Sequence, residues 1–275
     1  MKPVLITLLT LLTLQPGPKA IKKYAVYYGE KATYRQLRGY DLLVLDSHTH
    51  PPLKSLKSRG TMLLGYISLG ELESYRPDFQ KVKDQNILLK ENDNWKGSYM
   101  VDVRDRRWTH RVIDEVIPQI LRKGFHGVFL DTLDNPFYLE SQDPVTYKGM
   151  REAAIHLVRT IRMHYPDIKI MLNRGYAALD KLAPYVDMIM AESLYARYSF
   201  EKKAYIKVPK PEYKTQMSRL QSALRINPKV QIFSLDYCKP DDRATLMEIY
   251  KVQRKNGFIP YVATLELKEL VKEPK

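Results

Sequence analysis

Eight short runs of apolar residues, rich in β-branched and aromatic side chains, limit the possible fold of this chain more than any other feature of its sequence. They span residues 24–28, 42–46, 62–67, 127–131, 168–173, 187–192, 230–236 and 258–263. Runs that are almost continuously apolar are typical of strands covered on both faces, as in a parallel sheet. Segments with helical spacing lie between them, most clearly at residues 109–123, 144–164, 212–225 and 241–256.

This alternation predicts an α/β protein, and eight strand–helix repeats predict a (β/α)8 TIM barrel, with a doubly wound sheet as the alternative. No repeat or linker divides the chain, so we expect residues 21–275 to form a single domain. Two connections are longer than a barrel needs, residues 68–108 after strand three and residues 193–211 after strand six. Both follow the carboxyl ends of strands, where barrels build their sites, so we expect these long loops to form the walls of a cleft.

The N-terminus has the pattern of a secretory signal peptide. Lys2 precedes an apolar run at residues 4–14, and residues 15–20 form a polar, small-residue stretch suited to cleavage. We expect residues 1–20 to be removed and the protein to be secreted or periplasmic, with an uncleaved N-terminal anchor as the alternative. The run is shorter than the roughly 20 residues of a membrane span, and no other segment is that long. Cys238 is the only cysteine, which excludes an internal disulfide and a zinc site built on a cysteine pair.

Polar side chains follow the predicted strands at their carboxyl ends, which meet at one mouth of a barrel. Asp131 ends the fourth run and Glu192 ends the sixth. A carboxylate in an apolar strand is costly unless it has partners or a chemical task. Hydrolysis of a glycoside needs two carboxylates, one to protonate the leaving oxygen and one to attack or to activate water. Asp131 and Glu192 can form this pair, or they can cap helices or bind Arg104 or Arg174.

Four longer motifs narrow this choice: residues 65–78 (GYISLGELESYRPD), 99–105 (YMVDVRD), 124–134 (GFHGVFLDTLD) and 185–193 (YVDMIMAES). With Asn173 and the Asp236-Tyr237 pair, they resemble glycoside hydrolase family 114, which includes endo-α-1,4-polygalactosaminidases. The resemblance implies a barrel hydrolase that cleaves within an extracellular polysaccharide, such as an α-1,4-linked galactosamine polymer. It also implies that Asp131 and Glu192 are catalytic and that the reaction is retaining, with Asp131 favoured as nucleophile and Glu192 as general acid/base.

Further polar and aromatic residues at the strand ends and in the long loops are candidates for substrate binding. Asp102, Arg104 and Asp134 would orient the catalytic pair and hold the sugar, and Asn173 would bond a substrate hydroxyl or a catalytic carboxylate. Tyrosine faces suit sugar rings, while their hydroxyls bond ring substituents. The predicted substrate-binding set is Tyr28, Asp46, Tyr66, Glu71, Arg76, Asp102, Arg104, Asp134, Asn173, Tyr195, Asp236 and Tyr237.

His48 and His50 form a His-x-His pair after the second run, and some metal-dependent hydrolase barrels begin their ligand set in this way. A site of that kind also needs ligands from later strand ends. His110, His156 and His164 instead fall within helical stretches, and the eighth run ends without a carboxylate. We therefore expect no metal ligands and no cofactor, since neither a phosphate loop nor a dinucleotide motif is present.

The chain is basic, with 45 Lys and Arg against 31 Asp and Glu and a net charge of +14. No nucleic-acid-binding module is visible, so we expect a polysaccharide partner and no nucleic acid. A basic protein repels a cationic galactosamine polymer at long range, but the acidic strand ends could make the cleft itself negative. A second hypothesis is a non-catalytic glycan-binding barrel in exopolysaccharide assembly, which would keep the tyrosines and tolerate loss of either carboxylate.

Overall fold

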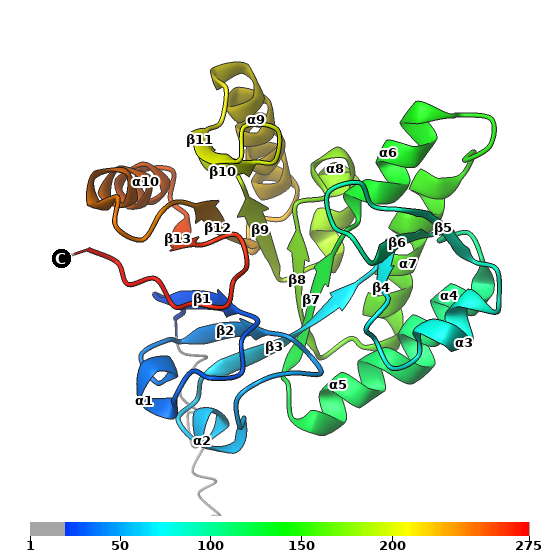
Figure 1. Ribbon diagram of the computed structural model, residues 1–275, viewed down its shortest axis with the longest axis horizontal. Coiled ribbons are helices and arrows are strands. Elements are labelled where there is room, and N and C mark those ends of the chain that lie inside the picture. The colour runs from blue at the N-terminus through cyan, green and yellow to red at the C-terminus, as the bar shows by residue number, and fades with distance from the viewer. Residues whose placement is uncertain (1–19, 275) are drawn as a thin grey trace, which may run out of the picture.

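The computed structural model describes residues 20–274, so the predicted signal peptide lies outside the described residues except for Ala20. Eight parallel strands form one sheet in the order β1-β2-β3-β7-β8-β9-β12-β13 (Figure 1). They are β1 (Tyr24–Tyr27), β2 (Leu42–Leu45), β3 (Met62–Ser68), β7 (Gly127–Asp131), β8 (Lys169–Asn173), β9 (Met188–Glu192), β12 (Gln231–Tyr237) and β13 (Ile259–Ala263). The strands follow chain order around a nearly closed sheet with helices between them, which confirms the (β/α)8 TIM barrel over the doubly wound alternative.

The first and last strands, β1 and β13, meet at a seam that is filled by aromatic side chains. The Tyr24 hydroxyl donates to the carbonyl of Ser234 on β12 at 2.6 Å. The Tyr24 ring also lies edge-on to the rings of Phe233 and Tyr261, with centroids 4.9 Å and 5.7 Å away. These contacts make the apolar interior continuous across the seam.

Of the four predicted helical segments, two agree with the helices of the barrel, one is divided into three helical pieces and one begins later than predicted. They are α1 (Tyr34–Leu37), α2 (Lys54–Lys57), α5 (Ile117–Lys123), α6 (Asp134–Gln142), α7 (Met150–His164), α8 (Leu179–Leu182), α9 (Lys210–Ile226) and α10 (Arg243–Lys255). The predictions at residues 212–225 and 241–256 correspond to α9 and α10. The predicted helix at residues 109–123 is α4 (Arg106–His110), a π-helical segment (Arg111–Val116) and α5 in succession. The prediction at residues 144–164 is wrong at its start, because Gly149 has a φ of 89° and the helix begins only after it.

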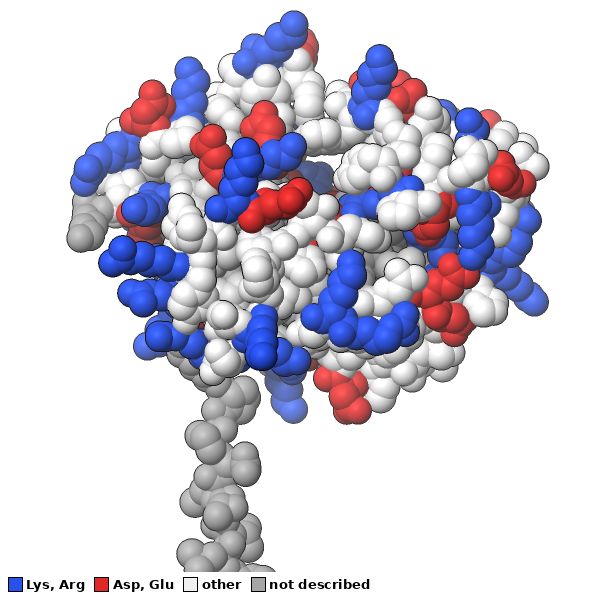
Figure 2. Space-filling view, turned by 60° about the horizontal axis from the view of Figure 1, so that its bottom comes forward, with Lys and Arg blue, Asp and Glu red and all other residues white. Residues whose placement is uncertain are grey.

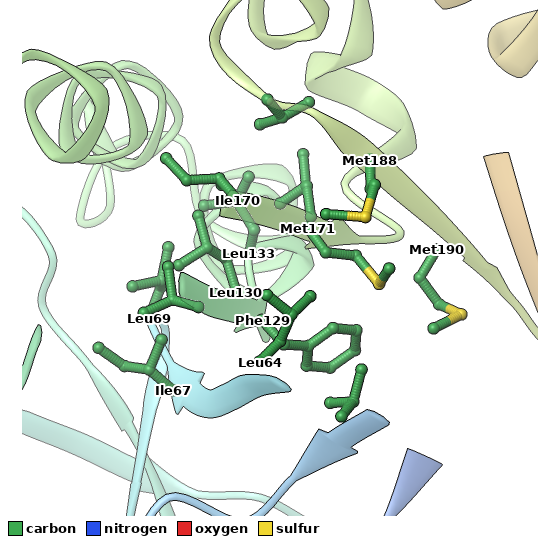
Figure 3. Packing of buried hydrophobic residues seen from close by; sticks show 14 of the residues in the cluster. Leu64, Ile67, Leu69, Phe129, Leu130, Leu133, Ile170, Met171, Met188 and Met190 are labelled. Carbon is green, nitrogen blue, oxygen red and sulfur yellow. The ribbon is translucent and has the colours of Figure 1, made fainter. Parts of the chain in front are cut away.

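Alternate residues along each strand face either the barrel interior or the surrounding helices. Phe129 of β7, Met171 of β8 and Met190 of β9 are buried. Figure 3 shows these three side chains extending to one side of their strands, while Leu130 and Ile170 extend to the other. The same alternation decides which side chains reach the mouth of the barrel at the strand ends.

Two excursions leave the barrel at the carboxyl ends of strands, in the two places predicted. After β3 the chain forms a small antiparallel sheet of β4 (Glu71–Glu73), β6 (Ser98–Val101) and β5 (Leu88–Glu91), with α3 (Phe79–Lys83) between β4 and β5. After β9 it forms the hairpin of β10 (Ala196–Ser199) and β11 (Ala204–Lys207). Figure 1 shows the small sheet and the hairpin on different sides of the barrel.

The surface charge of the chain is dispersed. On the face shown in Figure 2, Lys and Arg side chains are spread widely, with Asp and Glu side chains among them.

Among residues 20–274, no helix is long and apolar enough to cross a membrane.

Candidate active site

A cavity of about 540 Å³ lies at the carboxyl ends of the strands, where TIM barrels carry their active sites. Its walls include side chains from the small sheet, the hairpin and the segment after β13. Eight of the predicted site residues line it: Tyr28, Tyr66, Glu71, Asp131, Asp134, Asn173, Glu192 and Tyr237.

Asp131, Asn173 and Glu192 are the last residues of β7, β8 and β9, and strand alternation turns all three side chains into the mouth. Nδ2 of Asn173 donates to Oδ1 of Asp131 at 2.8 Å and to Oε2 of Glu192 at 2.6 Å. Because both oxygens accept from the same nitrogen, Oδ1 of Asp131 and Oε2 of Glu192 are no further apart than the sum of the two distances, 5.4 Å. The Tyr237 hydroxyl donates to Oε1 of Glu192 at 2.5 Å. One amide group therefore joins the two carboxylates.

The environment of this pair favours a single bound proton near neutral pH. Burial, and next the negative charge of Glu192, raise the pKa of Asp131 to about 7, although the hydrogen bond from Asn173 acts in the opposite direction. Burial also raises the pKa of Tyr237, so its hydroxyl stays protonated and serves as a donor. A proton shared by neighbouring carboxyl groups is what one group needs to act as an acid beside an ionised partner.

Glu71 lines the cavity but is saturated by donors from the protein. It accepts hydrogen bonds from Nδ2 of Asn92 at 2.6 Å, from Oγ of Ser98 at 2.5 Å and from Nδ2 of Asn135. Asn92 and Ser98 belong to the excursion after β3, whereas Asn135 is on α6. Glu71 therefore fastens one wall of the cavity to the barrel.

The lining of the cavity is more acidic than the chain as a whole. Asp134 and Arg174 form an ion pair on its wall, with Nε of Arg174 2.9 Å from Oδ2 of Asp134. The lining carries six carboxylates and three basic groups, namely Glu71, Glu73, Asp131, Asp134, Glu192 and Glu266 against Lys96, Arg174 and Arg197. This balance is opposite in sign to the net charge of +14.

Asp46 and Arg76 lie in an adjoining cavity and not among the residues around Asp131. Nη2 of Arg76 is 2.9 Å from Oδ2 of Asp46, and its Nε is 3.1 Å from Oε2 of Glu73. Burial alone would raise the pKa of Asp46, but the charge and hydrogen bonds of Arg76 lower it overall. Asp46 is thus the ionised partner of a buried arginine beside the cavity that holds Asp131 and Glu192.

Asp102, Arg104 and Tyr195 are also absent from the cavity lining. Arg104 makes two hydrogen bonds to Asp102, at 2.9 Å and 2.7 Å, and donates to two carbonyls in the turn before α7. This pair ties the excursion after β3 to that turn. The Tyr195 hydroxyl donates to Glu248 on α10 at 2.6 Å and so points away from Asp131 and Glu192.

Asp236 lies behind the mouth, where it is 0% exposed, and not at the surface that a substrate would contact. Strand alternation turns Tyr237 into the cavity and the preceding residue toward the helices. Asp236 accepts from the amides of Tyr195 and Ala196 at 2.7 Å and 2.9 Å, and from Gln253 at 2.6 Å. Burial raises the pKa of Asp236 to about 6. Its contacts hold the start of the hairpin, which differs from the predicted role in sugar binding.

Two aromatic residues that were not predicted as site residues meet across the cavity. Trp95, in the loop between β5 and β6, and Phe200, at the tip of the hairpin, are edge to face with centroids 5.5 Å apart. Both line the cavity, and they are 47% and 39% exposed. The sequence signal that could have pointed to Trp95 and Phe200 is the length of the two connections that carry them, because that length predicted the walls of a cleft. Glu266 joins the lining from the segment after β13, and no sequence motif marked it.

His48 and His50 make contacts within the protein. Nδ1 of His48 is 2.9 Å from Nη1 of Arg76, and Nδ1 of His50 is 2.9 Å from the carbonyl of Pro51. Burial, and next the charge of Arg76, lower the pKa of His48. Within residues 20–274, no group of three or more His, Cys, Asp or Glu side chains is arranged to hold a metal ion.

Comparisons with known proteins agree with this fold. The sequence profile of glycoside hydrolase family GH114 matches residues 12–274. An uncharacterized protein of Thermotoga maritima is 25% identical over 257 residues, which cover 84% of this chain and 77% of that protein. An uncharacterized protein of Deinococcus radiodurans is 22% identical over 219 residues, which cover 78% of this chain and 68% of that protein.

Two solved structures share the architecture. The glycoside hydrolase domain of PelA from Pseudomonas aeruginosa superimposes with a TM-score of 0.81 and 23% identity, covering 92% of this chain and 99% of that one. Aspergillus fumigatus Ega3, solved in complex with galactosamine, superimposes with a TM-score of 0.69 and 16% identity, covering 95% of this chain and 99% of that one.

A TIM barrel with two facing carboxylates at its mouth and a matching glycoside hydrolase profile defines the class of protein as a glycoside hydrolase. The chain belongs to family GH114, because the profile of that family spans nearly all of it. The resemblance expected from the sequence motifs is thereby confirmed.

Proposed function

We propose that this protein is a secreted enzyme that cleaves bonds within an extracellular polysaccharide, with Asp131 and Glu192 as its catalytic pair. The observation that carries the proposal is the position of the two carboxylates, which share the Asn173 amide in the cavity at the barrel mouth. In this proposal residues 1–20 are the signal peptide and residues 21–275 form the hydrolase domain.

The spacing of the carboxylates supports a retaining reaction. Their nearest oxygens are within the 5.4 Å set by the two hydrogen bonds of Asn173. Retaining enzymes place the two groups about 5–5.5 Å apart, whereas inverting enzymes leave about 6.5–9.5 Å for a water. Asp131 attacks the anomeric carbon, and the departing oxygen takes the proton of Glu192. Glu192 then removes a proton from water, and that water displaces Asp131 from the sugar.

The reverse assignment has one observation in its favour. The pKa of Asp131 is raised to about 7 by burial and by Glu192, which favours a proton on Asp131 before a sugar binds. The positive charge that develops at the anomeric carbon favours the ionised form of the adjacent carboxylate. We therefore propose that Asp131 is ionised once a sugar is bound and acts as the nucleophile.

Azide rescue distinguishes the two assignments. In Asp131→Ala, azide would replace the nucleophile and give a glycosyl azide of configuration opposite to the substrate. In Glu192→Ala with an activated aryl glycoside, azide would intercept the glycosyl-enzyme and give an azide of the same configuration. The opposite pattern of products would assign the nucleophile to Glu192.

The charge of the cavity supports a polymer of amino sugars as substrate. Even with one proton on the Asp131–Glu192 pair, acidic groups outnumber basic groups in the lining and attract a cationic chain locally, despite the basic exterior. The structurally similar Ega3 was solved with galactosamine. An α-1,4-linked galactosamine polymer, cleaved internally, is therefore the substrate that we propose.

The test is the release of reducing ends from cationic, neutral and anionic polysaccharides by the wild type, Asp131→Asn, Glu192→Gln and the control Asp167→Asn. Asp167 is an exposed carboxylate that precedes β8, at the end of the strand opposite to Asn173. We expect cleavage of the cationic polymer and a loss of about 10³-fold or more in the first two variants, with the control unchanged. Binding without cleavage, unaltered by either substitution, would instead indicate the non-catalytic glycan-binding barrel.

A further inference from the structure

A second cavity, of about 880 Å³, adjoins the catalytic one on the side of β1 and β2. Residues of the β1–α1 connection and of the turn after β2 contribute to its lining, together with the segment after β13. Five residues line both cavities: Tyr28, Tyr66, Glu73, Tyr75 and Glu266. The two cavities therefore adjoin along these five residues.

Tyr75 lies at the junction of the two cavities and is unusually exposed for an aromatic residue, at 73%. Its ring packs over the guanidinium of Arg76, with 5.0 Å between the charged carbon and the ring centroid. Arg76 is buried and is held by Asp46 and Glu73. A ring supported in this way offers an accessible face at a defined position, which suits the apolar face of a sugar.

The charges in the floor of the second cavity are already paired with each other. Arg76 bonds two carboxylates, Asp46 and Glu73, and so is not available to an anionic ligand. The remaining charged side chains of the lining carry both signs, with Glu30, Glu266 and Glu269 against Lys31 and Lys268. This lining disfavours a phosphate or sulfate ligand and fits a sugar unit recognised by stacking and hydrogen bonds.

We propose that the second cavity is a distal subsite, in which Tyr75 stacks on a sugar of the same chain whose reactive bond lies between Asp131 and Glu192. The proposal rests on the proposed polysaccharide hydrolase function and adds where the rest of the chain binds. Binding energy gained at a remote subsite helps to position the reacting bond, so longer chains are cleaved more efficiently than short ones. Tyr75 is a specificity residue in this arrangement and takes no part in bond breaking.

The test compares Tyr75→Ala, Tyr75→Phe and Tyr34→Ala on α-1,4-linked galactosamine oligosaccharides of increasing length. Tyr34 is a matched control, because it is 36% exposed and its ring lies over Arg59 at 5.8 Å, away from both cavities. In Tyr75→Ala we expect KM for long chains to rise about 5- to 10-fold, the magnitude of one aromatic contact. We expect kcat/KM on the shortest cleaved oligosaccharide to stay within about twofold, and Tyr75→Phe and Tyr34→Ala to behave as wild type.

Binding is measured in parallel, by calorimetric titration of the same oligosaccharides into Glu192→Gln and into the double variant Glu192→Gln/Tyr75→Ala. The subsite is supported if affinity increases with chain length in Glu192→Gln but not in the double variant. Cleavage that requires Asp131 but has the same length dependence in Tyr75→Ala as in wild type would overturn the subsite and leave the proposed function intact. Absence of Asp131-dependent cleavage would overturn the proposed function, and the titration would still decide the subsite.

Discussion

Asn173 donates to both carboxylates of the proposed catalytic pair, so its removal should change the pH dependence of the reaction as well as its rate. The pair loses its remaining proton as the pH rises through about 7, so kcat/KM of the wild type should fall above that pH. The hydrogen bond from Asn173 lowers the pKa of Asp131, and its loss in Asn173→Ala should move this limb to higher pH. The rate should also fall, by about 10- to 100-fold.

The measurement is kcat/KM against pH for the wild type, Asn173→Ala and the control Asn227→Ala. The Asn227 amide bonds the carbonyl of Ala183, outside the cavity. An alkaline limb that stays in place in Asn173→Ala would show that Asn173 does not set the proton affinity of the pair.

The raised pKa of Asp131 also predicts a cost in stability. A carboxyl group with a higher pKa in the folded state favours folding only while it is protonated, and this contribution is lost as the pH rises from about 4 to about 7. Asp131→Asn removes the buried charge and should therefore stabilise the protein by about 1–2 kcal/mol at pH 8, with little effect at pH 4. Urea unfolding of both proteins at the two pH values tests this. A stability difference that is the same at both would contradict it.

At the residue scale, the sequence predicted which side chains meet at the barrel mouth better than it predicted their surrounding contacts. Asp131, Asn173, Glu192 and Tyr237 follow apolar strands and have a family motif, and the structure brings them together. Asp236 has the same sequence signals as Tyr237, but adjacent strand residues face opposite sides of the sheet. Pairings with partners distant in sequence, such as Arg76 with Asp46, depend on tertiary structure and could not be predicted from local pattern.

At the scale of elements, the contact between Trp95 and Phe200 joins the two excursions across the cavity. We expect a double-mutant cycle on Trp95→Ala and Phe200→Ala, measured as the free energy of urea unfolding, to give a coupling of about 0.5–1 kcal/mol. The two substitutions should also raise KM for the polymer without a large change in kcat, since both rings line the cavity but neither is hydrogen-bonded to Asp131 or Glu192. If the change in unfolding free energy of the double variant equals the sum of the changes in the two single variants, the two rings do not stabilise each other.

Each strand boundary was predicted to within one residue, because each strand is a nearly continuous apolar run and burial on both faces requires such a run. The helices were less predictable. The sequence of α6 (DNPFYLESQ) contains a proline and no clear apolar stripe, so it was not predicted. The start of α7 depends on Gly149 in a left-handed conformation, and the preceding turn is held by Asp143, which accepts from the amides of Val145 and Thr146.

At the scale of the whole molecule, the exterior and the barrel mouth differ in their balance of basic and acidic side chains. The net charge of +14 keeps the exterior basic, while the strand ends gather carboxylates at one mouth. Composition predicted the first property and the strand pattern predicted the second. That the two cavities adjoin could not be predicted, because it depends on how the excursion after β3, the connection after β1 and the segment after β13 meet in space.

The most direct test of Asp131 and Glu192 as a nucleophile and acid/base pair is time-resolved proton NMR of the first reducing ends released from an α-linked amino-sugar oligosaccharide. With the carboxylate oxygens within 5.4 Å, we predict that the new reducing end first appears with the α configuration and then equilibrates. A first product of β configuration would contradict the covalent mechanism, because it would require a water between the two groups.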